Sequence, residues 1–171
     1  DLSDMRARKA DGTSLPVTRI DKQTWEVRHD GDDFTAEYYI HARTLSVRTS
    51  YADDAVAVLN GASIFTYIPG ATRLPVDLKV AVRDGAVVTT SLESTATGYR
   101  ATDYDQLVDA PLSIGTPSIR TFEVDGTSFD YVLHAPEGTN ADLERLVTDA
   151  RAIVTASAEI MGGFPFERYV F

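Results

Sequence analysis

Alternation of apolar and polar residues dominates the first hundred or so positions and predicts short β-strands. The clearest case is segment 34–42, FTAEYYIHA, in which all the even-numbered residues are apolar. Since successive side chains of a strand point to opposite faces, this pattern is typical of a sheet with one buried face. Further strands are predicted at residues 14–20, 24–27, 63–68, 74–82 and 86–92. Short strands at even spacing predict a mainly β fold, an antiparallel β-sandwich or saddle-like domain.

Two details of this strand-rich part carry specific expectations. Asp84-Gly85 is a favoured hairpin dipeptide, so we expect it to join the strands at 74–82 and 86–92. Trp25 is the only tryptophan. Because large aromatic side chains dominate core packing, we expect it to anchor the core.

The spacing of apolar residues changes near residue 140 and predicts a long helix after a hairpin. Strands at 118–124 and 128–134 flank Asp125-Gly126, another hairpin dipeptide. Apolar residues then recur every three or four positions up to Met161, which predicts a helix over 140–161 with one buried stripe. Thr139 or Asn140 is suited to cap its start, and Gly162 to end it.

The stretch 99–115, YRATDYDQLVDAPLSIG, links these two parts and fits neither pattern. Its carboxylates, Asp103, Asp105 and Asp109, alternate with bulky apolar residues and are followed by Pro111. Because proline fixes its own φ and restricts the residue before it, we expect neither a regular helix nor a central strand here. Two interpretations stay open: a structural corner, in which the aspartates cap turns, or the wall of a cleft.

Composition narrows the classes of partner. The chain has 171 residues, 43% of them hydrophobic, with a net charge of −10 and no cysteine. Such an acidic protein would be repelled by nucleic acid and by anionic membranes, so neither is expected as a partner. No apolar run approaches the roughly 20 residues that span a bilayer, and disulfides and thiolate metal sites are excluded.

The residues alone identify no catalytic or metal-binding site. His29, His41 and His134 lie far apart in the sequence, and none belongs to a His-Glu-x-x-His motif. No serine occupies a Gly-x-Ser-x-Gly turn, and no glycine-rich phosphate loop precedes a helix. A Ser-His-Asp triad or a pair of catalytic acids stays open, because either depends on how the chain folds.

Five segments in register resemble the glycyl aminopeptidases, a family of gluzincin-type zinc metallopeptidases. The best match is ATDYDQLVDAP at 101–111 together with Gly115. The other matching segments are residues 10–12 with 22–27, 45–48, 60–62, and the long helix with 163–171. The resemblance covers essentially the whole chain.

The resemblance implies the N-terminal portion of a larger enzyme. Residues 1–115 would form the N-terminal β domain, and 116–171 the opening hairpin and helix of a thermolysin-like zinc domain. The parent protein would remove N-terminal residues from peptides, with glycine favoured. Its zinc would be held by His-Glu-x-x-His and a later glutamate, which these residues do not include, so this chain would supply no catalytic residue and bind no zinc. Tyr104, Asp105 and Asp109 would face the substrate cleft, and the β domain would pack against the catalytic domain.

Other expectations accompany this one. The chain starts at Asp1 and stops within an apolar segment at Phe171, so we expect it to be a piece of a longer protein. Its helix stripe, left uncovered, would favour self-association. Related bacterial proteins are often exported, which favours a periplasmic or secreted location.

Two alternatives to the aminopeptidase interpretation stay open. One is an inactive scaffold descended from the peptidase, and the other is a stand-alone β-sandwich module that binds glycans or proteins through exposed aromatic residues. Candidates for that platform are Tyr39, Tyr51, Tyr67 and Tyr99.

Overall fold

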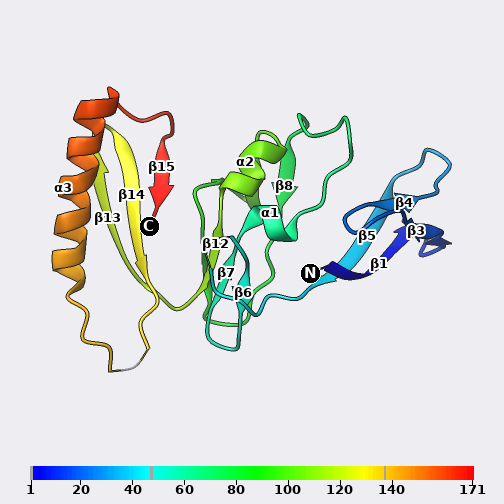
Figure 1. Ribbon diagram of the computed structural model, residues 1–171, viewed down its shortest axis with the longest axis horizontal. Helices are drawn as coiled ribbons and strands as arrows, with labels where there is room; N and C mark the ends of the chain where they lie inside the picture. The colour runs from blue at the N-terminus through cyan, green and yellow to red at the C-terminus, as the bar shows by residue number, and fades with distance from the viewer. Residues whose placement is uncertain (1, 47, 137) are drawn as a thin grey trace. The chain divides into compact units, whose positions relative to one another are not determined.

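The fold is mainly β and built from antiparallel sheets, as the sequence predicted. A computed structural model describes residues 2–46, 48–136 and 138–171. The chain divides into two compact units, Asp1–Arg43 and Thr44–Phe171 (Figure 1). The expected domain boundary near residue 115 stays a prediction.

The first unit is organised around its opening strand. β1 (Leu2–Lys9) pairs antiparallel with both β2 (Ser14–Leu15) and β5 (Phe34–Ile40). A second ribbon joins β3 (Val17–Arg19) to β4 (Trp25–Val27). These strands agree with the alternation seen at residues 14–20, 24–27 and 34–42.

Little of the first unit is buried. Among its described residues Ala7 alone is a buried hydrophobic. Trp25 is only half-buried, and the Arg19 guanidinium lies 5.4 Å from the centre of its ring. The expectation that Trp25 anchors the core is therefore wrong: its strand belongs to a two-stranded ribbon, which has too few neighbours to cover an indole ring.

The second unit begins with a four-stranded antiparallel sheet. Its order is β6 (Tyr51–Ala52), β7 (Ala57–Leu59), β12 (Leu112–Gly115) and β9 (Val87–Thr89). β12 pairs on both sides, so the stretch 99–115 does contain a central strand, contrary to our expectation. Pro111 permits this because it precedes β12, where its missing N–H removes no bond from the ladder.

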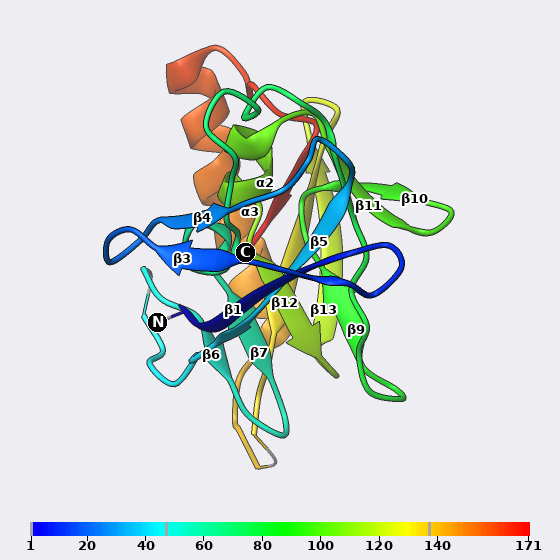
Figure 2. The ribbon, with the colours of Figure 1, turned by 90° about the vertical axis from the view of Figure 1, so that its right-hand side faces the viewer.

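A three-stranded sheet follows in the order β10 (Glu93–Thr95), β11 (Gly98–Ala101), β8 (Val76–Leu78). The prediction of a hairpin at Asp84-Gly85 is wrong. A turn does form there, with Ala86 N donating to Arg83 O (3.2 Å). The strands on its two sides, however, pair with β11 and β12 instead of each other. The β10–β11 hairpin projects outward from the neighbouring strands (Figure 2).

Two short helices complete this part of the second unit. The strand predicted at 63–68 is wrong: its first two residues belong to α1 (Gly61–Ile64), and the other four lie in a loop. The helical turn forms because the Asn60 side chain accepts a hydrogen bond from Ala62 N and caps it. α2 (Tyr104–Asp109) also departs from our expectation of no helix in the central stretch. The buried core beneath comprises Leu92, Ala101, Leu107 and Ala110.

The C-terminal part of the second unit is a three-stranded sheet with a long helix alongside (Figure 1). β13 (Ser118–Val124) and β14 (Thr127–Leu133) form the predicted hairpin, and β15 (Arg168–Val170) joins β14 in parallel. α3 (Leu143–Met161) is shorter at its start than predicted. Its cap is Asp142, whose Oδ1 accepts from Arg145 N (3.0 Å), and not Thr139 or Asn140.

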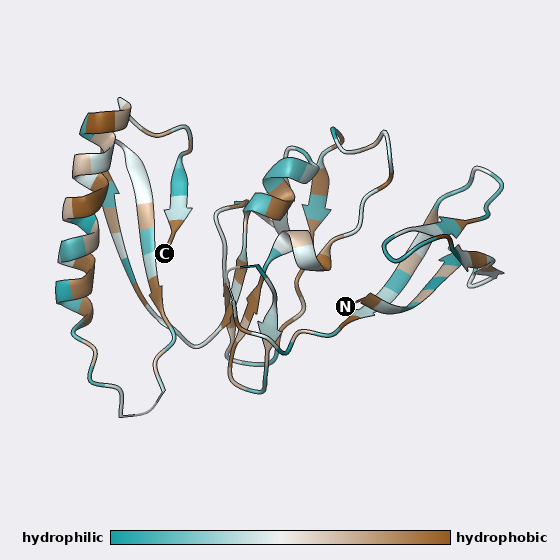
Figure 3. Cartoon of the chain, viewed as in Figure 1, coloured by the Kyte–Doolittle hydropathy of each residue, from teal (hydrophilic) through white to brown (hydrophobic). Residues whose placement is uncertain are grey.

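One face of α3 is buried and the rest is open. Helix and sheet share a core of Phe122, Val124, Phe129, Ala150, Val154 and Ala158. Ile153, Ile160 and Met161 are 67%, 86% and 81% exposed, so apolar bands continue around the helix (Figure 3). Among the described residues, no helix has both the length and the apolar character that crossing a membrane requires.

Candidate functional site

The motif ATDYDQLVDAP folds into the end of β11, helix α2 and the start of β12. Asp103 caps the helix: its Oδ1 accepts a hydrogen bond from Gln106 N (2.9 Å). Gln106 Oε1 in turn accepts from Thr102 N (2.6 Å), which satisfies a second donor at the helix start. Such reciprocal capping stabilises a helix too short to persist alone. Two conspicuous polar residues of the motif are thus explained by local structure.

A second matching motif, Asn60-Gly61-Ala62, lies against this one. A Cβ at Gly61 would lie 2.6 Å from Val108 Cα and 2.9 Å from Leu107 O. Only glycine therefore allows α1 to approach α2 this closely. We call α1, α2 and the loop of residues 65–75 the corner.

Tyr104 fastens that loop to α2. Its hydroxyl donates to Phe65 O (3.0 Å), and its backbone N–H donates to Thr72 O (2.9 Å). The ring packs on the core beneath α2, and its centre lies 5.1 Å from that of Tyr67. Tyr104 is thus half-buried and holds the loop, with part of its ring covered by Tyr67.

The carboxylates of the corner differ in their partners. Arg73 Nη1 lies 3.3 Å from both Asp103 Oδ2 and Asp105 Oδ2, so one guanidinium serves two acids. Asp109 is exposed on the last turn of α2, and within the described chain its carboxylate takes part in no hydrogen bond or ion pair. The interpretation of Asp109 as a turn cap is therefore wrong, and its charge is not neutralised locally.

The same corner exposes large apolar side chains. Tyr67, Ile68 and Leu74 are 59%, 65% and 61% exposed, all on the loop of residues 65–75. We define the corner surface as these three residues together with Asp105 and Asp109 of α2, the helix to which Tyr104 fastens the loop. Exposed apolar side chains near charged groups are typical of interaction surfaces.

The four tyrosines expected to form an aromatic platform are divided between the two units and differ in exposure. Tyr39 of the first unit and Tyr67 of the second are exposed. Tyr99 and Tyr51 are half-buried, with hydroxyls that donate to Val88 O and to Asp53 Oδ2, respectively. Within the second unit, no ring contact joins Tyr67 to Tyr99 in the part that the structure describes. The platform of a binding module stays a prediction.

The structure brings together one pair of reactive side chains that the sequence did not reveal. Ser113 Oγ on β12 lies 2.6 Å from His134 Nε2, just after β14. Burial lowers the pKa of His134, which keeps the imidazole neutral near pH 7. In the described chain no carboxylate hydrogen-bonds this histidine, so a Ser-His-Asp triad is not formed. The two residues are 21 positions apart in the sequence, and no sequence signal predicted their contact.

No metal centre is assembled in the part of the chain that the structure describes. No group of three or more histidines, cysteines, aspartates and glutamates could hold a metal ion there. His29 is engaged locally, with its Nδ1 accepting from Gly31 N (3.2 Å).

Comparison with known families and structures identifies the class of protein. Residues 1–116 match the model of the peptidase M61 N-terminal domain, and the chain belongs to this family. The chain is also similar to the crystal structure of an aminopeptidase N family protein from Idiomarina loihiensis, with a TM-score of 0.89 and 28% identity. That match covers 99% of this chain and 30% of the other, so the chain spans less than a third of that protein. No curated protein sequence matches.

Proposed function

We propose that this chain is the non-catalytic N-terminal portion of a zinc metallo-aminopeptidase that removes N-terminal residues, glycine preferred, from peptides. The observation that carries the proposal is the match of residues 1–116 to a peptidase N-terminal domain. The similarity to a protein described as an aminopeptidase supports the reaction class. The family resemblance further favours a bacterial periplasmic or secreted protein of the glycyl aminopeptidase type.

In this proposal the chain packs against the catalytic domain and walls its cleft through the corner surface. Tyr67, Ile68 and Leu74 offer apolar area for that contact. The motif ATDYDQLVDAP, which resembles the family best, forms α2 and holds the loop of residues 65–75 through Tyr104. The residues that shape the corner would therefore also position the surface that lines the cleft.

Asp109 is the strongest candidate for contact with substrate. An aminopeptidase must recognise a free ammonium group, and a nearby carboxylate attracts it more strongly where water is excluded. Asp105 already shares Arg73, whereas Asp109 has no cationic neighbour within ion-pair distance in the described chain. Tyr104 would act only as a positioning residue, because its hydroxyl is engaged by Phe65 O.

In this proposal the residues of this chain do not bind the zinc ion. Zinc sites need three or four ligands that converge, and the described residues offer no such group. The metal would be held elsewhere in the parent protein. The test compares the 171-residue chain with the parent protein. We expect the chain to bind no stoichiometric zinc and to leave glycyl-p-nitroanilide uncleaved, while the parent binds zinc and cleaves this substrate. Chelator-sensitive cleavage by the chain alone would contradict the proposal.

The role of Asp109 is tested by Asp109→Asn in the parent protein. Because this carboxylate makes no hydrogen bond, we expect the free energy of unfolding to change by less than about 0.5 kcal/mol. If Asp109 faces the cleft, the KM for glycyl-p-nitroanilide should rise several-fold. Asp54→Asn, at another exposed aspartate, is the matched control and should alter neither quantity. An unchanged KM for Asp109→Asn would remove it from the cleft.

A further inference from the structure

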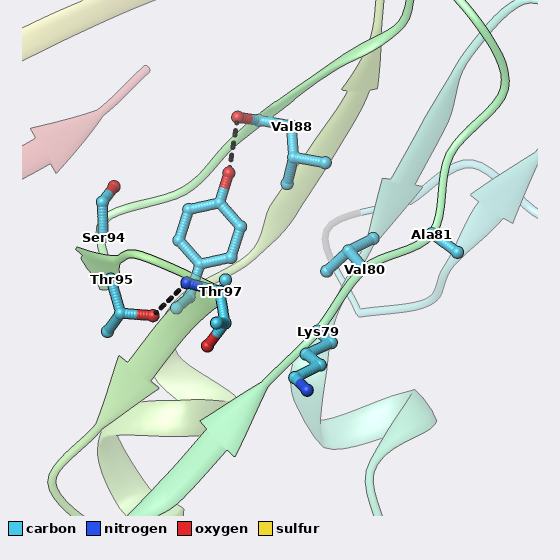
Figure 4. A pocket seen from close by; sticks show the side chains of 9 residues that line it. Lys79, Val80, Ala81, Val88, Ser94, Thr95 and Thr97 are labelled. Atoms are coloured by element: carbon cyan, nitrogen blue, oxygen red, sulfur yellow. Dashed lines mark hydrogen bonds between the residues drawn. The ribbon is translucent and has the colours of Figure 1, made fainter.

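A groove in the second unit lies apart from the residues used above. It has a volume of about 520 Å³, within the range of sites that bind small ligands. Its lining residues, shown in Figure 4, are Lys79, Val80, Ala81, Val88, Ser94, Thr95, Thr97, Gly98 and Tyr99. The groove lies between the β10–β11 hairpin and the segment that follows β8 (Figure 4).

The groove exists because two paired strands separate at this point. β8 and β11 pair as far as Leu78 and Tyr99. At Gly98 an added Cβ would lie 2.2 Å from Leu78 O, so the strands approach very closely just where their ladder ends. From Lys79 onward the chain leaves the hairpin, which opens the space between them (Figure 4).

The segment that leaves has backbone groups without protein partners. Residues 79–82 belong to no helix or strand, and none of them takes part in a backbone–backbone hydrogen bond within the described chain. This segment continues β8, the edge strand of its sheet, and its free N–H and C=O groups offer a template on which an extended peptide can add as a strand.

The walls provide both apolar area and hydroxyl groups. The Tyr99 hydroxyl donates to Val88 O (3.1 Å), which fixes the ring between the two walls (Figure 4). Thr97 N donates to Thr95 Oγ1 (3.4 Å), so the tip of the hairpin is also ordered. A site fixed before binding loses less conformational entropy when a ligand enters.

The positive charge in the groove favours peptides that present a carboxylate. Lys79 is the only charged residue that lines the groove, and no carboxylate lies within ion-pair distance of it in the described chain. Its ammonium group is therefore available to an anionic ligand. It complements a carboxylate, and the neighbouring threonine hydroxyls can donate to the same oxygen atoms.

We propose that this groove binds the C-terminal end of an extended peptide. The peptide backbone pairs with residues 79–82, an apolar side chain contacts Val88 and Tyr99, and the terminal carboxylate binds Lys79. This binding is independent of the function proposed above, since it requires only the second unit of this chain and no contact with a catalytic domain.

The test compares two probes on the 171-residue chain: acetyl-Thr-Val-Thr-Val with a free carboxylate, and the same peptide as its C-terminal amide. We expect the acid to bind about tenfold more tightly, because hydrogen bonds to charged groups are the stronger ones. Its advantage should shrink as sodium chloride is added. In ¹H–¹⁵N spectra the shifted amides should belong to residues 79–82 and 94–99.

Variants separate the carboxylate contact from the backbone contact. Lys79→Met should remove the preference for the acid, while Lys22→Met, at an exposed lysine that does not line the groove, should keep it. Val80→Pro and Ala81→Pro each delete one backbone N–H group. Successive N–H groups of an extended chain point to opposite sides, so only one of the two faces the peptide. The corresponding variant should bind both probes about tenfold more weakly. Unchanged melting temperatures will show that these variants fold.

The proposal is overturned by any of four results. The acid and the amide bind the wild-type chain equally, the preference for the acid survives in Lys79→Met, or both proline variants bind like the wild type. Shifted amides confined to other parts of the chain would overturn it as well.

Discussion

At the scale of single residues, the close approach of α1 to α2 at the corner leaves no room for a side chain at residue 61. Gly61 has ordinary backbone geometry, so its role is the space it leaves free. The match of Asn60-Gly61-Ala62 to the family pattern therefore has a physical reason: a cap followed by a helix crossing with no room for a methyl group.

Gly61→Ala should lower the free energy of unfolding by about 1–3 kcal/mol, the usual cost of overpacking. The new methyl group would lie 2.6 Å from Val108 Cα and 2.9 Å from Val108 O, and these backbone atoms cannot rotate away as a side chain could. Urea unfolding of the 171-residue chain measures the change. Ala62→Ser, at the exposed neighbour in α1, is the control and should stay within about 0.5 kcal/mol. A neutral Gly61→Ala would mean that the two helices separate at little cost.

His134 should make the free energy of unfolding decrease as the pH falls below 6.5. Burial lowers its pKa from the ordinary 6.5, so the unfolded chain binds more protons than the folded one in this range. The contribution of the neutral imidazole is complete above pH 6.5 and is lost as the pH falls toward the folded pKa. Hydrogen bonds from Thr13 N and Gln23 N lower the pKa of Asp11 and Asp21 below 3.8, so these carboxylates titrate well below pH 6.5.

Urea unfolding at pH 7.5 and 5.5 checks this expectation. His134→Gln should flatten the dependence, whereas His29→Gln, at an exposed histidine, should leave it intact. If the wild type is equally stable at both pH values, His134 is not desolvated in solution.

At the scale of elements, the sequence predicted what is local and missed what depends on distant partners. The hairpin at 118–134 and the C-terminal helix were predicted because turn residues and a 3.6-residue period lie within one segment. Trp25 and Asp84-Gly85 were misjudged because the number and identity of neighbouring strands decide burial and pairing, and neither is encoded locally.

The central stretch shows the same limit at the candidate site. Asp103 caps α2 and Pro111 precedes β12, but neither element was predicted, because the six residues of α2 carry too few positions for a helical period and the partners of β12 lie far away in the sequence. Tyr104, Asp105 and Asp109 could be selected only by family resemblance. Their separate roles, as an anchor for a loop, a partner of Arg73 and an unneutralised charge, required the structure.

The outer face of α3 should promote self-association of the 171-residue chain. Ile153 and Ile160 are largely exposed and lie two turns apart on the same side of the helix. Sedimentation velocity should show association that increases with concentration, and Ile153→Lys with Ile160→Lys should abolish it. Their exposure means that stability should change by less than about 1 kcal/mol.

A buried position on the same helix serves as the control for this prediction. Val154→Ala, at a residue only 6% exposed, should instead destabilise the fold while leaving association unchanged. A wild-type chain that stays monomeric at high concentration would show that this apolar face needs no cover.

At the scale of the whole molecule, the two units differ in what stabilises them. The second unit contains two buried clusters, one centred on Leu92 and Ala101 and the other on Phe122 and Phe129. Salt bridges such as Lys9–Asp30 lie on the surface of the first unit, where such pairs contribute little. A large part of the cohesion of the first unit must therefore come from its β-ladders.

This difference predicts unequal hydrogen exchange. Local opening costs less free energy where few apolar contacts are broken, so the amides of β1 and β5 should exchange faster than those of β13 and β14 under native conditions. Mass spectrometry of peptides from residues 2–40 and 118–133, after timed exposure to deuterated buffer, measures both in one sample. Ala7 is the one buried hydrophobic residue that the structure describes in the first unit, so Ala7→Gly should accelerate exchange there and leave 118–133 unchanged. Equal protection of the two regions in the wild type would mean that the units unfold together, and that surface contacts hold the first unit more firmly than its small core allows.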